Sequence, residues 1–361
     1  MPIGQLPKYE QVKRSLIAEI EQGRWTTGGT IPSEAQLLRR FNVSRPTLVR
    51  SLQDLVREGY LHRRQGKGTF VAERNQRDNN HKAQGTIPVF TSSYWSSETV
   101  SVSEVLVRLL RGIQAALGPA HIDLSLRYAA AGAIDGETRR FLEAAEPGVA
   151  LVVEPSFSSP LLHELTSRGW TVWALNEPWP EGNAVYIDQE RSGYLACKYL
   201  IEKKGCRHIA LLNGPRDAYW GFAAKTRGYQ TALLEAGISM DPKLICEGEH
   251  IIDMEAGRAM MRGLLQEGLE IDGVVGVSDA KAIGAVAAAQ DAGRRVPDDL
   301  PVIGIDDILA GSTIPPIPAV ALPFEEVGRC AAEEALRRNI DGHNRRFTHV
   351  EIKLKPTLIE R

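Results

Sequence analysis

Hydrophobic residues follow two different periodicities along the chain. Near the N-terminus they recur every four positions, as in Val12, Leu16 and Ile20, which is typical of an amphipathic helix. Further on they gather into short apolar runs, at residues 148–153, 171–175, 207–212, 272–277 and 300–305. Apolar strands that alternate with helices of about 10 to 15 residues indicate parallel sheets covered by helices on both faces.

A polar segment separates the two patterns. Residues 73–87 contain almost no large apolar side chain and show neither a helical nor a strand period, which predicts a linker. We therefore expect a small domain in residues 1–72 and a larger α/β domain in residues 88–361. A chain of 361 residues is long enough for two domains, the larger of them with two lobes.

Three short helices are predicted in the first domain. The first spans residues 9–22, the second begins at Ser33 with a capping-box partner at Gln36, and the third is capped by Ser44. Two short helices joined by a tight turn can present the start of the second one to the major groove of DNA. The candidate DNA-contacting residues on these helices are Ser33, Ser44, Arg45, Pro46, Thr47 and Arg50.

A basic hairpin is predicted directly after the third helix. Residues 60–71 consist of two short strand-like runs around a glycine-containing turn. Such a wing can place cations beside phosphates or in the minor groove. Its candidate DNA-contacting residues are Arg64, Gln65, Gly66 and Lys67.

The charge of the chain divides at the same boundary. Residues 1–72 contain twelve lysines and arginines against six acidic residues, so they carry +6 and leave −8 on residues 73–361 of the net −2. A basic module on an acidic body is expected when only one part meets phosphates. The alternatives are a solvated helix face with a chance surplus of charge and a three-helix domain that packs against a partner protein.

The head resembles the winged helix-turn-helix of the GntR family. The resemblance is carried by PSEAQLLRRFNVSRPTLVRSLQDLVREGYLHRRQGKGTFV and extends over residues 7–72. The family usually places a second arginine where Val49 stands, whereas Arg50 lies about 100° further round the helix. Ala35 likewise replaces a common arginine. The resemblance implies a DNA-binding domain whose base contacts depend mainly on Arg45 and the wing.

The body resembles the sensor domain of the lactose/galactose-repressor (LacI/GalR) family, which is itself similar to periplasmic sugar-binding proteins. Residues 185–215, 225–238 and 274–307 are closest to the family pattern, and the resemblance covers residues 86–361. It implies a two-lobed α/β fold of the type I periplasmic-binding-protein kind with parallel sheets. Three crossovers are expected, near residues 182, 321 and 346, with a small-molecule effector bound between the lobes.

Polar residues that follow the strands are candidates for effector binding, because ligands of such folds bind at the carboxyl ends of strands. Asp306 can accept two hydrogen bonds from sugar hydroxyls. Lys225 replaces a family arginine and so substitutes a point charge for a bidentate fork. The candidate effector-binding residues are Tyr94, Trp95, Asn176, Lys225, Arg227, His250, Ser278 and Asp306.

Each of these candidates has a purely structural alternative. Asp306 could cap the following turn, Tyr94 and Trp95 could belong to the core, and His250 could be an ordinary surface residue. Asp188 and Asp279 are interpreted mainly as helix N-caps, since an acidic residue before a helix is favoured there.

Several classes of protein find no support in the sequence. The chain contains no GxGxxG, Walker-A, HExxH or GxSxG pattern, and its four cysteines lie far apart without metal-ligand spacing. We therefore expect no enzyme activity, no cofactor and no metal. The chain also lacks a signal-peptide pattern and any run of about 18 apolar residues, so a cytoplasmic protein outside the membrane is expected.

The expected function is that of a homodimeric transcriptional regulator. It would bind double-stranded operator DNA, repress rather than activate, and respond to a polar effector, in the first instance a sugar or sugar derivative. Nucleosides and other polar metabolites remain alternative effectors. A solute-binding receptor and a sugar-active enzyme are the alternative functions.

Overall fold

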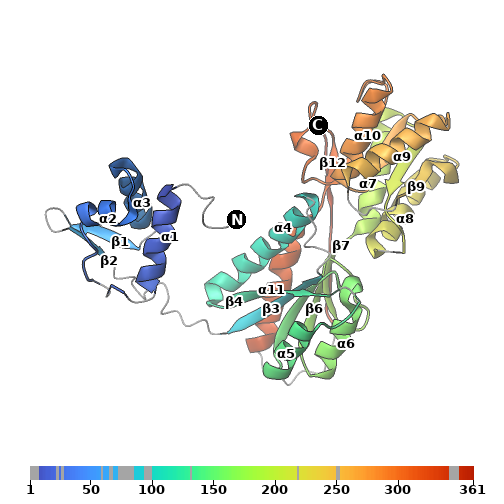
Figure 1. Cartoon of the computed structure of the whole chain (residues 1–361). Coiled ribbons are helices and arrows are strands. Elements are labelled where there is room, and N and C mark those ends of the chain that lie inside the picture. The colour runs from blue at the N-terminus through green and yellow to red at the C-terminus, as the bar shows by residue number, and fades with distance from the viewer. Residues whose placement is uncertain are drawn as a thin grey trace. The chain divides into compact units, whose positions relative to one another are not determined.

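A computed structural model describes residues 8–21, 24–25, 28–57, 60–64, 68–71, 85–92, 100–130, 132–217, 219–248, 253–340 and 349–361. The chain forms two compact units, residues 1–82 and 83–361, each of which is described by itself (Figure 1). Strand β3, Thr86–Ser92, already belongs to the second unit, although residues 73–87 were predicted as a linker. Within the described ranges, every helix is too short or too polar to traverse a lipid bilayer.

The first unit contains three helices followed by a two-stranded hairpin. These elements are α1 (Lys8–Glu21), α2 (Glu34–Phe41), α3 (Arg45–Arg57), β1 (Leu61–Arg64) and β2 (Gly68–Val71). The capping box predicted before α2 is confirmed, because Ser33 Oγ accepts from the backbone of Gln36 while the Gln36 side chain accepts from Ser33 N at 2.9 Å. Asn42 then ends α2 in the left-handed region, at φ 48°, which allows the tight turn into α3.

The core of the first unit forms between the three helices and the hairpin. The inward face of α3 consists of Leu48, Leu52 and Leu55, which are buried with Leu16 of α1 and Leu37 of α2. The segment between α1 and α2 also adds to the hairpin. Its residues exchange backbone hydrogen bonds with β2, as from Ile31 N to Thr69 O at 3.1 Å.

The first lobe of the second unit is a six-stranded sheet in which every pairing is parallel. Its strand order is β13-β7-β6-β5-β3-β4. Its elements are β3 (Thr86–Ser92), α4 (Val100–Leu117), β4 (Asp123–Ala129), α5 (Gly136–Ala144), β5 (Val149–Val153), α6 (Ser159–Ser167), β6 (Thr171–Leu175), β7 (Asn183–Ile187), α11 (Phe324–Ile340) and β13 (Glu351–Leu354).

The second lobe is also a six-stranded sheet, in the order β14-β12-β11-β10-β8-β9, with only β14 antiparallel to its neighbour. Its elements are α7 (Gln189–Lys204), β8 (Ile209–Asn213), α8 (Trp220–Glu235), β9 (Ile245–Glu247), α9 (Met254–Gln266), β10 (Gly273–Gly276), α10 (Asp279–Asp291), β11 (Val302–Asp306), β12 (Ala319–Ala321) and β14 (Thr357–Ile359).

Helices cover both faces of each sheet, as the apolar strands predict. In the first lobe, α4 and α11 lie side by side on one face (Figure 1), while α5 and α6 pack on the other. In the second lobe, α7 and α8 cover one face and α9 and α10 the other. The five strands predicted from apolar runs are confirmed as β5, β6, β8, β10 and β11.

Two of the three predicted crossovers between the lobes are misplaced. The crossover expected near 321 is confirmed, because β12 ends at Ala321 and α11 begins at Phe324 in the other lobe. The crossover expected near 182 instead follows Ile187, since β7 extends the first sheet by pairing with β6. The third follows Leu354 rather than lying near 346, because β13 pairs with β7 before the chain returns to the second lobe as β14.

Candidate functional site

The start of α3 presents the candidate DNA-contacting side chains of the first unit. Arg45, the first residue of α3, has a side chain that is 78% exposed and lies 3.9 Å from the carboxylate of Glu34 on α2. The hydroxyl groups of Ser44 and Thr47 lie 2.8 Å apart, and Pro46 between them is exposed. Ser33 is exposed as well, with its hydroxyl group engaged in the α2 cap. This surface offers one largely exposed guanidinium group beside hydroxyl groups, a combination suited to contacts with bases and phosphates.

Arg50 lies on a different side of α3. Its guanidinium carbon is 3.8 Å from the ring centroid of Tyr9, so it stacks on α1, although the residue remains exposed. A few residues away, Arg40 forms an ion pair with the mostly buried Glu19 and so contributes less free charge. Among the predicted arginines of the helices, the structure therefore leaves Arg45 the most open to a nucleic acid.

The wing is described only at its two strands. β1 and β2 pair antiparallel from Leu61 with Val71 to Arg64 with Gly68, as the basic hairpin predicts. His62 and Phe70 stack across the strands with ring centroids 5.5 Å apart. The side chain of Arg64 and the whole of the predicted Gln65, Gly66 and Lys67 lie outside the described residues.

Buried polar side chains from both lobes of the second unit gather where the strands end. Those of the first lobe follow β5 and β6, and those of the second lobe lie on the loop after β8, on α8 and at the end of β11. We call this group the inter-lobe cluster, and its members are Glu154, Asn176, Glu177, Tyr219, Lys225 and Asp306.

Hydrogen bonds connect the cluster within and between the lobes. Asn176 Nδ2 donates to Glu154 Oε1 at 2.7 Å, and Ser156 N donates to Glu177 Oε2 at 2.8 Å. Tyr219 Oη donates to Asn176 O at 3.3 Å and so joins the second lobe to the first. The cluster is therefore a junction of the two lobes, built from polar groups rather than apolar ones.

Three members of the cluster hold backbone conformations that are rare for residues with side chains. The φ angles are 46° for Glu154, 63° for Asn176 and 115° for Asp306. Such angles cost about 1 to 3 kcal/mol each and concentrate at functional sites. All three residues come directly after a buried strand or end one, so the strained backbone turns their side chains toward the junction of the lobes.

Burial dominates the electrostatics of the first-lobe carboxyl groups. It raises the pKa of Glu154 to about 8, helped by the nearby charge of Glu177, while hydrogen bonds from Asn176 and Tyr219 and the charge of Lys225 act in the opposite direction. Burial also raises the pKa of Glu177, against the hydrogen bonds from Ser156. Both carboxyl groups thus lie in surroundings that penalise their charged form.

The second lobe contributes an acid and a base to the same junction. Lys225 is 4% exposed and its Nζ donates to Val277 O at 2.9 Å. Burial lowers the pKa of Lys225 and raises that of Asp306, and each group opposes this effect on the other. The two predicted effector residues are therefore brought together as an electrostatically coupled pair.

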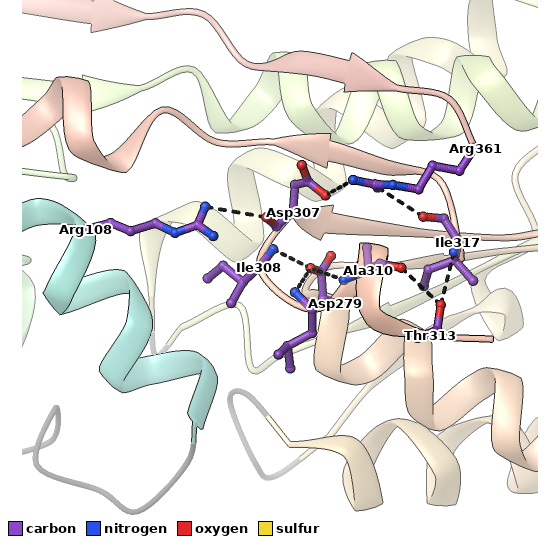
Figure 2. A network of polar contacts seen from close by, with 9 residues as sticks. Arg108, Asp279, Asp307, Ile308, Ala310, Thr313, Ile317 and Arg361 are labelled. Atoms are coloured by element: carbon purple, nitrogen blue, oxygen red, sulfur yellow. Dashed lines mark hydrogen bonds and ion pairs between the residues drawn. The ribbon is translucent and has the colours of Figure 1, made fainter. Parts of the chain in front are cut away.

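The backbone around Asp306 is held by a network of charged side chains (Figure 2). Asp279 Oδ2 accepts hydrogen bonds from the backbone of Ile308, Leu309 and Ala310 at 2.6, 2.8 and 3.0 Å. Arg361 donates to Asp307 Oδ1 at 2.6 Å. Arg108, on α4 of the first lobe, reaches the carbonyl oxygen of Asp307 at 3.4 Å, so the network also spans the two lobes.

The prediction that Asp279 is a helix N-cap is wrong. Ser278 caps α10, with its hydroxyl group accepting from Lys281 N, and Asp279 is the first helical residue. Its side chain is directed to the 308–310 backbone instead, where three amide groups donate to one charged oxygen, an arrangement stronger than a single cap bond. The N-cap role predicted for Asp188 is confirmed, with a hydrogen bond from Arg191 N at 3.0 Å.

The remaining predicted effector residues are not all brought to the cluster. Arg227 lies on the outer side of α8, where its half-exposed guanidinium group pairs with Glu190 at 3.1 Å. Ser278 is buried close to the cluster but is engaged as the α10 cap. Tyr94, Trp95 and His250 lie outside the described residues.

Sequence reasoning missed several members of the site. Glu154 and Glu177 follow the predicted strands 148–153 and 171–175, so the rule that was applied to Asn176 would also have found them. Tyr219 and Trp220 begin α8, and the ring of Trp220 meets that of Tyr186 from the first lobe at 5.7 Å. Within the described part of the chain, no group of histidine, cysteine or acidic side chains is arranged to hold a metal ion.

The pKa of Glu154 has a consequence for stability. The pKa of Glu154 is about 8 in the folded protein, against an ordinary value of 4.5 that applies to the unfolded chain. Between these two pH values the folded protein keeps a proton that the unfolded chain loses. The free energy of unfolding should therefore fall as pH rises from 5 to 8. Glu154→Gln removes this proton linkage, so its free energy of unfolding, measured with urea across this range, should fall less steeply.

The matched control for this measurement is Glu255→Gln, which removes an exposed carboxylate of α9. The control should keep the pH dependence of the wild type. A Glu154→Gln variant whose stability follows the same pH profile as the wild type would contradict the assignment of the proton to Glu154.

Two family models match the chain. Residues 8–71 match the model for bacterial regulatory proteins of the gntR family, and residues 197–361 match the model for a periplasmic binding protein-like domain. These two matches confirm the resemblances that the sequence analysis drew for the head and for the body.

Curated relatives include two bacterial regulators. The HTH-type transcriptional regulator CelR of Thermobifida fusca is 37% identical over 153 residues, which are 42% of this chain and 44% of that protein. The arabinose metabolism transcriptional repressor of Halalkalibacterium halodurans is 26% identical over 362 residues, covering 93% of this chain and 92% of the repressor. The chain thus spans less than half of the first relative and most of the second. Both relatives are transcriptional regulators rather than enzymes.

A solved structure described as a transcriptional regulator CelR–cellobiose complex has a similar fold. Its TM-score is 0.63 at 24% sequence identity, and the match covers 88% of this chain and 90% of the other. The similarity supports the α/β architecture with two parallel-sheet lobes.

Proposed function

We propose that this chain, whose residues 8–71 form a GntR-family DNA-binding domain and whose body is periplasmic-binding-protein-like, is a transcriptional repressor controlled by a sugar or sugar derivative. The observation that carries the proposal is the presence of two separate sites in one chain. An exposed arginine stands at the start of α3 in the first unit, and buried polar groups from both lobes converge in the second.

The first unit would place α3 in the major groove of operator DNA. Arg45 would contact base edges, Ser44 and Thr47 would contact phosphates, and the wing with Arg64, Gln65, Gly66 and Lys67 would follow the adjacent backbone. Ser33, Pro46 and Arg50 would support this contact from the neighbouring surface. A protein with this role acts in the cytoplasm, where the DNA is.

The second unit would bind the effector between its lobes. Asp306, Lys225 and Asn176 lie where hydroxyl groups of a sugar could be held, and Trp220 offers an aromatic face beside them. CelR has been solved with cellobiose, and the arabinose repressor is named for another sugar, which favours a sugar here as well.

The two sites would be coupled through a homodimer. Two heads would bind a pseudo-palindromic operator, and the effector would change the relation of the lobes and hence the spacing of the heads. The effector can shift the equilibrium between operator-bound and operator-free protein only if it binds these two forms with different affinities. This difference in effector affinity is therefore the quantity to measure.

Arg45→Ala tests the assignment of the head. The operator would first be obtained by selecting duplexes from a randomised library with the full-length protein. We expect Arg45→Ala to bind this operator about 10- to 100-fold more weakly, since one good arginine contact with a base contributes about 1 to 3 kcal/mol. Fluorescence anisotropy at fixed salt measures the affinity, and the thermal shift caused by effector should be unchanged.

Arg24→Ala is the matched control for this variant. It removes another exposed arginine of the first unit, 62% exposed, which pairs with Glu19 of α1 at 3.4 Å rather than with a residue of α2 or α3. The control should lose much less affinity for the operator. Equal losses in both variants would mean that the effect is one of net charge, and wild-type affinity in Arg45→Ala would refute the role of α3.

A further inference from the structure

The inter-lobe cluster contains more buried acid than buried base. Glu154, Glu177 and Asp306 are 3%, 6% and 6% exposed, whereas Lys225 is the single buried cation of the cluster, at 4%. An ionised carboxylate that is removed from water costs several kcal/mol unless a partner compensates for it. The cluster therefore has more carboxyl groups than cations at the place where a ligand is expected, and burial favours their protonated form until a cation arrives.

The carboxyl groups without a cationic partner, those of Glu154 and Glu177, lie on the first lobe. Lys225 is held in the second lobe by its hydrogen bond to Val277 O, where Asp306 is its electrostatic partner. Among the described residues, no lysine, arginine or histidine forms an ion pair with Glu154 or Glu177. Their hydrogen-bond donors are neutral groups, namely Asn176 and Tyr219 for Glu154 and Ser156 for Glu177.

Two buried oxygen atoms close to Glu154 also lack hydrogen-bond donors. Asn176 Oδ1, in a side chain whose Nδ2 already contacts Glu154, is buried with no hydrogen-bond partner in the described structure. The same holds for Thr91 Oγ1 at the end of β3, which pairs with β5 so that its carboxyl end lies next to Glu154. Both residues are at most 2% exposed. Buried acceptors without donors are uncommon and mark a place where a ligand can supply them.

We propose that the effector carries a protonated amine, as an amino sugar does, and that this amine binds against Glu154 and Glu177. An ammonium group has three N–H donors and no acceptor, so it supplies both the missing charge and the missing hydrogen bonds. A sugar phosphate or sugar acid would bring like charge to the same carboxyl groups. The inference rests on the proposed sensor function and narrows its ligand to one chemical class.

Pairs of sugars that differ in one substituent test the proposal. The full-length protein would be titrated by isothermal calorimetry with glucosamine and glucose, with galactosamine and galactose, and with glucose 6-phosphate. We expect at least one amine to bind about tenfold or more tightly than its neutral counterpart, and the phosphate not to bind. Equal or tighter binding of the neutral sugars, binding of the phosphate, or no binding of either amine would overturn the proposal.

These outcomes separate the inference from the function on which it rests. If a neutral sugar binds best and changes operator affinity, the sensor function stands and the amine preference is wrong. If no sugar of either kind changes operator affinity, the failure lies with the proposed function.

Two further measurements locate the amine. Glu154→Gln keeps the size of the side chain and replaces the protonated carboxyl group with a neutral amide, so it should fold. We expect it to lose the tenfold preference, whereas Glu255→Gln should keep it. In the wild type, an ammonium group would lower the pKa of Glu154, which faces Glu177, Tyr219 and Lys225. Amine binding near pH 7 should therefore release a proton, seen as binding enthalpies that depend on the buffer. Unchanged preference in Glu154→Gln, or no proton release, would contradict the proposal.

Discussion

Replacing Asp306 with asparagine is expected to weaken effector binding about 100-fold while leaving operator affinity in the absence of effector unchanged. Asp306 is 6% exposed and ends β11 beside Lys225 at the junction of the lobes. Hydrogen bonds to a charged group contribute about 1.5 to 3 kcal/mol each, so the loss of two such bonds from sugar hydroxyls accounts for this factor. Asparagine tolerates a positive φ about as well as aspartate does, so the substitution adds little strain at φ 115°.

The experiment compares Asp306→Asn with Asp291→Asn. Asp291 is an exposed carboxylate on α10 that pairs with Arg258 at 2.6 Å, so its replacement removes the same charge far from the proposed ligand. Calorimetry measures effector affinity and anisotropy measures operator affinity for both variants. An Asp306→Asn protein that binds effector like the wild type would remove Asp306 from the site.

Gly228→Ala is expected to lower the free energy of unfolding of the second unit by about 3 kcal/mol or more. Extra atoms in a well-packed core typically cost about 1 to 3 kcal/mol, so this is a large effect of its kind. A Cβ on Gly228 of α8 would overlap the carbonyl oxygen of Glu190 on α7 and lie 2.6 Å from the backbone nitrogen of Tyr194. Because the overlapping atoms belong to the backbone, no rotamer change relieves the contact and the two helices must separate. A Cβ on Gly193 of α7 would meet the backbone of Lys225 in the same way.

Gly263→Ala provides the opposite result in the same lobe. Gly263 lies within α9, and an added Cβ would have no atom within 4 Å apart from its chain neighbours and the backbone of its own helix, so alanine should stabilise the helix by up to about 1 kcal/mol. Urea unfolding of the full chain measures both variants. Equal stabilities for the two alanine variants would show that the α7–α8 contact is not as close as described.

Features that depend on residues close together in the sequence could be predicted without knowledge of the fold. The capping box at Ser33 and Gln36 and the strand at 300–305 depend on neighbours within a few positions. The basic hairpin was also readable, because its strands pair across a short turn. The misplaced crossovers show where this reasoning ends: β7 and β13 are short strands, and only their pairing with each other assigns them to the first lobe.

The site was readable only in part, and Asp279 illustrates the reason. Its position before α10 was compatible with an N-cap, but its actual partners lie about 30 positions away, in the turn after β11. In the same way, Asn176 donates a hydrogen bond to Glu154 and accepts one from Tyr219, which lies 43 positions further along the chain. No local pattern reports such distant neighbours.

The order of side chains along this chain was sufficient for the helices of its head, for five strands of its body and for the basic character of its head. These properties follow from periodicity and from charge, which act between near neighbours. The folded arrangement was required to reveal that Arg45 is open while Arg50 stacks on Tyr9, and that Glu154, Glu177 and Asp306 share one buried junction. Burial and electrostatic coupling depend on distances in space, and those distances exist only once both lobes have formed.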